Sequence, residues 1–207
     1  KNAALQSNQQ LAALIARGTT GRGQVVDAAM VDGAAHLFTM VHGLLGTGAW
    51  RDEREANLLD GGAPFYAVYE CADGKFVAVG ALEPEFWAEL VTGLGVDLPG
   101  EQYDPGTWEA QRAAFAAAFR TRSRDEWAEH FEGTDACVAP VLSLREAPTH
   151  PHAVGRGSFV ADVNGHPVPR PGPRLSATPL RDPGPEPVPG ADTRAYLLAH
   201  GFGADEV

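Results

Sequence analysis

The sequence predicts a mixed α/β fold with a small α+β domain near its centre. Alternating or apolar runs at 65–71 and 75–81 flank an Ala-Asp-Gly turn, which is a strong local signal for a β-hairpin. After the hairpin, Phe86, Leu90 and Leu94 recur at helical spacing. The chain has 207 residues, of which 44% are hydrophobic, so it can bury a core and belongs with globular rather than disordered proteins.

The first part of the chain is expected to contain two helices and a strand. Residues 11–17 (LAALIAR) have helical propensity, and the glycines within 18–23 predict a helix stop followed by a loop. Residues 24–30 (QVVDAAM) are interpreted as a strand. Residues 31–45 are interpreted as a helix with Asp32 as its N-terminal cap.

The end of the hairpin leads directly into the next helix. Pro84 fits the first turn of a helix, which places Glu83 at a strand-to-helix corner. A carboxylate is favoured there because helix N-terminal amides attract negative charge. The spacing alone is compatible with a second interpretation, in which Glu83 and Glu85 only cap the helix.

Two further helices are predicted at 107–118 and 123–131. Thr107 is a possible cap for the first, and Ser123 with Glu126 three residues later predicts a capping box for the second. Aromatic side chains recur along both helices and are assigned to the core: Phe115, Phe119, Trp127 and Phe131.

The last third of the chain is expected to be partly extended. Residues 136–142 read as a short strand, which Pro140 restricts to a sheet edge or a strand end. A hairpin is predicted around Asn164 and Gly165, and residues 167–190 form a Pro- and Gly-rich run of the kind found in linkers and straps. A short helix, TRAYLLAHGF, should follow a cap at Asp192 or Thr193.

Composition excludes several classes of function. The net charge of −11 argues against a nucleic-acid surface, which would need clustered cations. No stretch is apolar enough for a membrane span, and the first residues lack the apolar centre of a secretory signal. The pair His150 and His152, with a proline between them, is a weak metal motif, and a helical turn with a surface His pair is the preferred interpretation, so no metal site is expected. Cys71 and Cys137 are predicted to be buried free thiols rather than a disulfide.

Two stretches carry a resemblance to a known family. They are GRGQVVDAAMVDG at 21–33 and, from 58 to 87, LLDGGAPFY followed by ADGKF and VGALEPEFW. Together they closely resemble the α-methylacyl-CoA racemases of the family III CoA-transferase superfamily, from about Gly18 onward. The resemblance implies a C-terminal part of that fold, in which the small α+β domain is joined by segments of a larger Rossmann-like domain.

The resemblance also implies roles for four residues. Racemases of this family invert the carbon beside a CoA thioester carbonyl, using an Asp on one face and a His paired with a Glu on the other. By motif, that Glu is Glu83, the candidate catalytic residue. Gly61 and Gly62 correspond to a glycine-rich loop that approaches the thioester, with Asp60 positioning it; a simple turn before a strand is the alternative.

The same resemblance suggests that the chain is incomplete as a catalyst. The family's His and Asp precede the region of resemblance, and none of the seven histidines falls in a matching motif. Lys1 to Gln10 depart from the family pattern, so we expect a replaced start or the later part of a longer protein.

Domain boundaries and partners follow as expectations. Residues 1–56 would be the end of the large domain with a connecting helix, 57–160 the small domain, and 161–207 a return strap with a C-terminal helix. An acyl-CoA substrate is expected, with no separate cofactor because CoA is part of the substrate. An interlocked homodimer and a cytoplasmic location in lipid metabolism are also expected.

Two other functions are compatible with the sequence. A family III CoA-transferase would move CoA between carboxylic acids through an Asp-linked anhydride. A noncatalytic fragment could instead dimerise through apolar surface left open by an absent domain. The Leu-Glu-Pro-Glu-Phe corner at 82–86 favours the racemase, because the transferases have no required Glu there.

Overall fold

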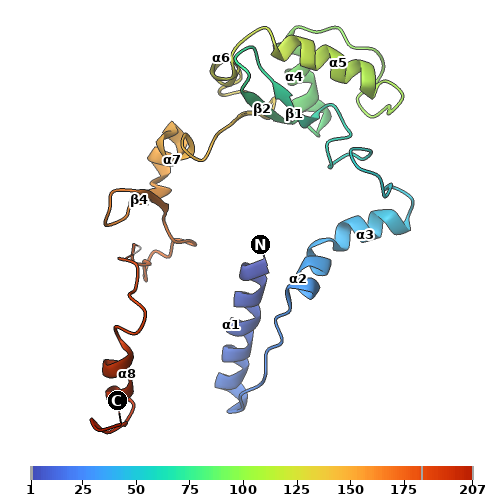
Figure 1. Cartoon of the computed structure of the whole chain (residues 1–207). Helices are drawn as coiled ribbons and strands as arrows, with labels where there is room; N and C mark the ends of the chain where they lie inside the picture. The colour runs from blue at the N-terminus through green and yellow to red at the C-terminus, as the bar shows by residue number, and fades with distance from the viewer. Residues whose placement is uncertain (1, 183, 207) are drawn as a thin grey trace. The chain divides into compact units, whose positions relative to one another are not determined.

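A computed structural model describes residues 2–182 and 184–206. The chain divides into two compact units, Lys1–Val141 and Leu142–Val207, and each is described by itself. Figure 1 shows the order of the elements along the chain. The three domains predicted at 1–56, 57–160 and 161–207 are not tested by this division and stay a prediction.

A three-stranded antiparallel sheet forms the centre of the first unit. Its strands are β1 (Tyr66–Glu70), β2 (Phe76–Gly80) and β3 (Val138–Val141), in the order β1-β2-β3. The predicted hairpin is therefore confirmed, and β3 is an edge strand, as Pro140 required. Gly74 closes the hairpin turn with φ 73°, a conformation that glycine adopts without a steric penalty.

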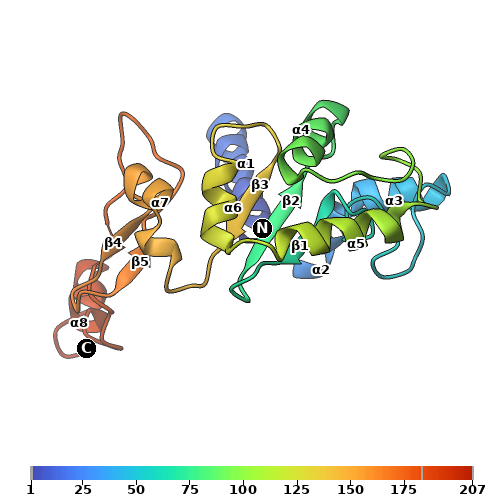
Figure 2. The ribbon, with the colours of Figure 1, turned by 90° about the horizontal axis from the view of Figure 1, so that it is seen from above.

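Three helices pack near the sheet in the first unit, as Figure 2 shows. They are α4 (Pro84–Leu94), α5 (Trp108–Phe119) and α6 (Arg124–His130). Helix α5 contacts β1, and α6 contacts β2 and β3. The predicted capping box of α6 is present, since Ser123 and Glu126 exchange side-chain and backbone hydrogen bonds.

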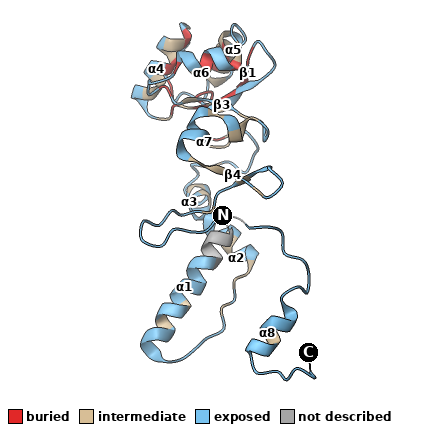
Figure 3. Ribbon diagram, turned by 90° about the vertical axis from the view of Figure 1, so that its left-hand side faces the viewer, coloured by how far each residue is buried: buried red, intermediate tan, exposed pale blue. Residues whose placement is uncertain are grey.

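The core lies between the sheet and these helices, in the region coloured red in Figure 3. The ring of Phe119 stacks on Tyr69 at 5.1 Å between centroids and meets Trp127 edge-on at 5.3 Å. Trp127 Nε1 donates a 2.8 Å hydrogen bond to the carbonyl of Phe119, which satisfies the buried indole. All four aromatic residues assigned to the core from their spacing are buried: Phe115, Phe119, Trp127 and Phe131.

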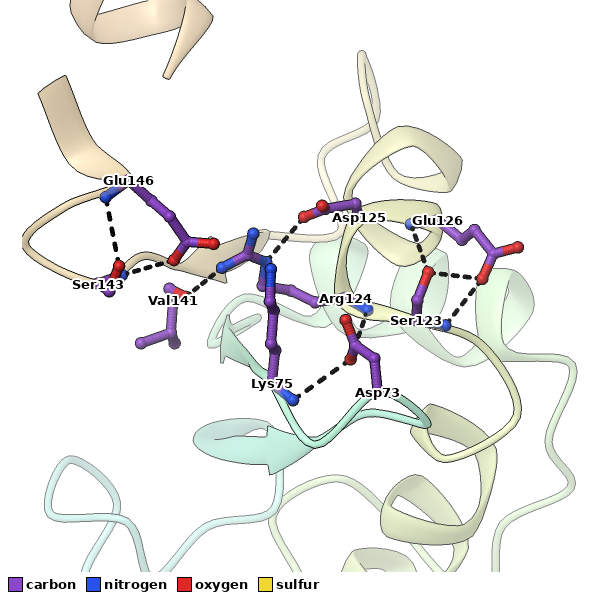
Figure 4. A network of polar contacts seen from close by, with 9 residues as sticks. All are labelled: Asp73, Lys75, Ser123, Arg124, Asp125, Glu126, Val141, Ser143 and Glu146. Carbon is purple, nitrogen blue, oxygen red and sulfur yellow. Dashed lines mark hydrogen bonds and ion pairs between the residues drawn. The ribbon is translucent and has the colours of Figure 1, made fainter. Parts of the chain in front are cut away.

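A buried arginine ties the last strand to the hairpin turn (Figure 4). The Arg124 side chain is 5% exposed, and its Nη1 donates a 3.0 Å hydrogen bond to the carbonyl of Val141 at the end of β3. Its Nε donates to Asp125 at 2.8 Å, and its backbone N–H donates to the Asp73 carboxylate at 3.2 Å. The guanidinium is thus paired, as a buried charge requires.

The first helices depart from the sequence prediction. Helix α1 (Asn2–Thr20) is longer than predicted and ends before Gly21, while α2 (Met30–Leu37) and α3 (Thr39–Gly46) replace the single helix expected at 31–45. The strand predicted at 24–30 is wrong: 22–29 form no regular element, and no strand pairs with them in the described part of the chain. Local β propensity is insufficient without a pairing strand.

Two local predictions in the first unit are also wrong. Asp32 is not the cap of the helix, because Ala29 is the N-cap residue and Asp32 lies in the first turn. Cys71 is buried as expected, but Cys137 is exposed; both are free thiols. Cys137 adopts φ 54°, and its neighbour Ala136 takes the buried position instead.

The second unit contains short elements. The predicted hairpin around Gly165 is confirmed as β4 (Phe159–Ala161) and β5 (Pro167–Pro169). A 3₁₀ turn and two helices complete it: η1 (Ala147–Thr149), α7 (Pro151–Arg156) and α8 (Thr193–Ala199). Among the described residues, no helix is both long and apolar enough to cross a bilayer, and no cluster of His, Cys, Asp and Glu has the geometry of a metal site.

Loss of a buried aromatic ring should lower the free energy of unfolding far more than loss of a ring on the exposed face of the sheet. Phe119→Ala deletes a ring that is 0% exposed and should lower the free energy of unfolding by about 3–5 kcal/mol. Phe76→Ala, on the opposite face and 44% exposed, is the matched control and should cost under about 1 kcal/mol. Urea unfolding measures both, and equal losses would contradict this placement of the core.

Candidate functional site

Glu83 lies where the sequence places it, between β2 and α4. It is the N-cap residue of α4, with φ −71° and ψ 144°, and Pro84 follows in the first turn. Its side chain is exposed and makes no capping hydrogen bond, so the interpretation of Glu83 as only a side-chain cap is not supported by the geometry. Its carboxylate accepts no hydrogen bond within the described residues and is free for another partner.

Two side chains from the following loop fix the backbone that carries Glu83. The amide of Gln102, 5% exposed, donates to the carbonyls of Ala81 at 3.1 Å and Leu82 at 2.8 Å. The hydroxyl of Tyr103 also donates to the Leu82 carbonyl. Three hydrogen bonds, of which the one to Ala81 is buried, therefore hold the corner while the Glu83 carboxylate is exposed, an arrangement that suits a preorganised site.

Sequence reasoning missed Gln102. It lies in a turn-rich loop about 20 residues from the carbonyls that it binds, and spacing gives no signal for such a contact. A buried side-chain amide must find hydrogen-bond partners, so the residue type predicts such a contact only once the burial of Gln102 is known.

Asp60 organises the loop before β1. Its carboxylate accepts hydrogen bonds from the backbone N–H groups of Asn57 at 2.9 Å, Gly62 at 3.0 Å and Ala56 at 3.3 Å. It also accepts one from the Asn57 side chain at 2.7 Å. Burial acts to raise the pKa of Asp60, but these hydrogen bonds outweigh it and hold the pKa below the usual value for aspartate.

The two glycines are required by the loop itself. Gly61 has φ 95°, which disfavours any residue with a Cβ atom. A Cβ on Gly62 would lie 2.6 Å from both the N and O atoms of Asn57, closer than non-bonded atoms can approach. The structure therefore gives a packing reason for this pair that needs no substrate.

A cleft of about 800 Å³ joins the loop to the outer face of the sheet. Asp60 and Gly61 line it, whereas Gly62 and Glu83 do not. Other side chains in its wall come from α5 and all three strands or their ends: Tyr66, Ala78, Arg112 and Cys137. The structure thus brings two of the four predicted site residues into one cleft.

Cys137, which lines this cleft, is close enough to Glu83 to be affected by its charge. Partial burial raises the pKa of the Cys137 thiol, and the nearby negative charges of Glu83, Asp135 and Glu89 raise it further. A thiol held in its protonated form is a poor nucleophile. Cys137 is therefore a lining residue of the cleft in its thiol form rather than a candidate for covalent catalysis.

Comparison with protein families and curated proteins gives consistent matches. The family described as CoA-transferase family III matches residues 2–193. The α-methylacyl-CoA racemase of Mus musculus is 43% identical over 203 residues, which cover 94% of this chain and 52% of that protein. The Homo sapiens α-methylacyl-CoA racemase is 41% identical with the same coverage.

Solved structures match the fold. A CAIB/BAIF family protein from Brucella suis has a TM-score of 0.63 at 22% identity, covering 92% of this chain and 51% of that chain. Rv3272 from M. tuberculosis has a TM-score of 0.63 at 19% identity, covering 86% and 48%. The chain thus spans about half the length of the relatives that it matches.

The charge of Asp60 should make stability depend on pH in the acid range. Its folded pKa lies below the unfolded value of about 3.9, so its stabilisation is present above that value and is lost as pH falls through the folded pKa. Asp60→Asn should lower the urea midpoint at pH 7 and have a smaller effect near pH 2. The exposed Asp52→Asn is the control. A midpoint difference that is independent of pH would contradict the role of the ionised carboxylate.

Proposed function

The chain belongs to CoA-transferase family III, and from this premise we propose that it forms the glutamate-bearing part of an α-methylacyl-CoA racemase. The observation that carries the proposal is the 41–43% identity to two proteins of that name across 94% of the chain. The proposed substrate is a 2-methylacyl-CoA thioester. CoA is part of that substrate, so no separate cofactor is proposed, and a cytoplasmic role in lipid metabolism accompanies the proposal.

The reaction requires a proton to leave one face of the α-carbon and another to arrive on the opposite face. An acid and a base must flank the carbon, and a hydrogen-bond donor must stabilise the enolate oxygen formed between the two steps. In this proposal a His and an Asp from outside these 207 residues act on the two faces. The cleft beside Asp60 and Gly61 would receive part of the thioester.

Glu83 would act through the His rather than on the substrate. A carboxylate that accepts a hydrogen bond from one imidazole nitrogen fixes the ring and its tautomer, and it raises the basicity of the other nitrogen. Two features of the corner support this role. The carboxylate is exposed and unoccupied, and its backbone is held by Gln102 and Tyr103.

A CoA-transferase is the second candidate function. A CaiB/baiF CoA-transferase family protein of Caenorhabditis elegans is 35% identical over 150 residues, so the wider family includes proteins with that name. The two candidates differ in chemistry, since a transferase exchanges CoA with a free acid and leaves the α-carbon configuration unchanged. Transfer to free acids without loss of the α-proton would favour the transferase.

Replacement of Glu83 should slow α-proton exchange. In the native gene product, Glu83→Gln should lower the rate of deuterium incorporation from heavy water into a 2-methylacyl-CoA by about 100-fold, because the His loses its partner. Glu85→Gln is the matched control: it makes the same change two residues later, on an exposed side chain in the first turn of α4, and should leave the rate near wild type.

The isolated 207-residue chain provides a second arm of that experiment. We expect no exchange from it, with or without the Glu83 substitution. Exchange by the isolated chain that falls in Glu83→Gln would mean that it supplies its own acid and base. In that case the proposal of a His and an Asp from elsewhere would be wrong.

We also propose that the chain acts within an interlocked homodimer. Large apolar side chains of α2 and α3 are exposed in the structure, among them Met30 at 71%, Val31 at 73% and Met40 at 58%. Exposed apolar side chains on two neighbouring helices support an interface there. Light scattering of the native gene product should give twice the chain mass, and a monomer at micromolar concentration would contradict the dimer.

A further inference from the structure

A cation on α5 holds the glycine loop from the side opposite Asp60. We propose that Arg112 is a positioning residue for the proton transfer, fixing the Gly61–Gly62 peptide at the edge of the cleft. The part that concerns catalysis rests on the proposed function. The part that concerns the loop stands on the contacts alone.

Two hydrogen bonds join the Arg112 guanidinium to the glycine loop. Its Nη2 donates a 2.5 Å hydrogen bond to the carbonyl of Gly61 and a 2.8 Å hydrogen bond to the carbonyl of Gly62, about 50 residues away in the chain. The side chain is half-buried and also lines the cleft. In the described part of the chain Arg112 forms no ion pair, so no carboxylate competes with these two carbonyls for its guanidinium.

The peptide group between Gly61 and Gly62 therefore lies between two opposite charges. Its carbonyl oxygen accepts from Arg112, and its N–H donates to the Asp60 carboxylate at 3.0 Å. A peptide is planar and carries a dipole of about 3.5 D, so a cation at the oxygen end and an anion at the N–H end fix its plane. Hydrogen bonds to charged groups are also stronger than those between neutral groups.

The hydrogen bonds of Arg112 and Asp60 to the Gly61–Gly62 peptide, here called the clamp, offset the backbone flexibility of the two glycines. Adjacent glycines have the largest backbone freedom of any residue pair, and holding them in one conformation has an entropic penalty. The packing requirement at Gly61 and Gly62 excludes larger residues that would stiffen the chain. The charges on both sides of the peptide fix its orientation without requiring a side chain on either glycine.

Order in this loop matters for the rate of the proposed reaction. A displacement of a reacting group by about 1 Å can lower a rate about 100-fold. A loose loop would still allow the thioester to bind through its other contacts, so KM should change less than kcat. This split distinguishes a positioning role from a general loss of folded protein.

The catalytic arm of the test uses three variants of the native gene product. Arg112→Ala should lower kcat for α-proton exchange by about 10- to 100-fold with KM within about twofold. Arg112→Lys, which keeps a donor and the charge, should recover part of kcat. Arg120→Ala is the matched control: it removes a cation at the end of the same helix, where Arg120 pairs with Glu70 at 2.9 Å on the surface, and kcat should be unchanged.

Chemical rescue of kcat by guanidinium ion distinguishes a positioning role of Arg112 from a role in stability alone. Guanidinium ion at low millimolar, non-denaturing concentration should raise kcat of Arg112→Ala and leave Arg120→Ala unaffected. Equal changes in kcat and KM, no rescue, and no recovery in Arg112→Lys would together overturn the positioning role.

A stability arm tests the clamp without using activity. Asp60→Asn, Arg112→Ala and the double variant are compared by urea unfolding. The double variant should lose less than the sum of the two single shifts in midpoint, because both side chains act on one peptide. Additive shifts would overturn the clamp. If wild type exchanges no 2-methylacyl-CoA while the shifts are non-additive, the proposed function fails and the clamp stands.

Discussion

Burial of one face of the three-stranded sheet is the constraint on which the described geometry of the first unit depends. The helices α4, α5 and α6 supply the covering side chains, and Phe119 and Trp127 fill the space between them and β1. Because the sheet is covered on that side, the chain must turn sharply from β2 into α4. The sharp turn is what places Glu83 at a corner, and the position of α5 is what brings Arg112 to the glycine loop.

The backbone groups of the corner and of the glycine loop are paired, whereas the carboxylate proposed for function is not. Gln102 satisfies the carbonyls of the corner, and Asp60 satisfies the backbone N–H groups of the loop. Glu83 has no such partner within the described residues. Buried polar groups are costly when unpaired, whereas an exposed carboxylate keeps its hydration. The protein can therefore present Glu83 to another group without loss of stability.

The helices α2 and α3 differ from the region around the sheet, because their apolar side chains are not buried. Helices α2 and α3 contain no buried residue, although both are rich in apolar side chains. Several of these apolar side chains are largely exposed, among them Met30 at 71% and Val31 at 73%. The break between α2 and α3 at Phe38 and the irregular backbone at 22–29 lie in the same region, where the described helices contact one another but bury no side chain.

Local signals in the sequence by themselves determined the hairpin, the capping box at Ser123, the aromatic core and the position of Glu83, since each depends on residues within a few positions of one another. Tertiary structure alone decided which groups lie behind the site. Gln102 reaches the Glu83 corner across about 20 residues, and Arg112 reaches Gly61 across about 50. It also decided that Cys137 is exposed and that 24–30 is not a strand. Burial and pairing partners arise from contacts between distant segments, which spacing along the chain does not encode.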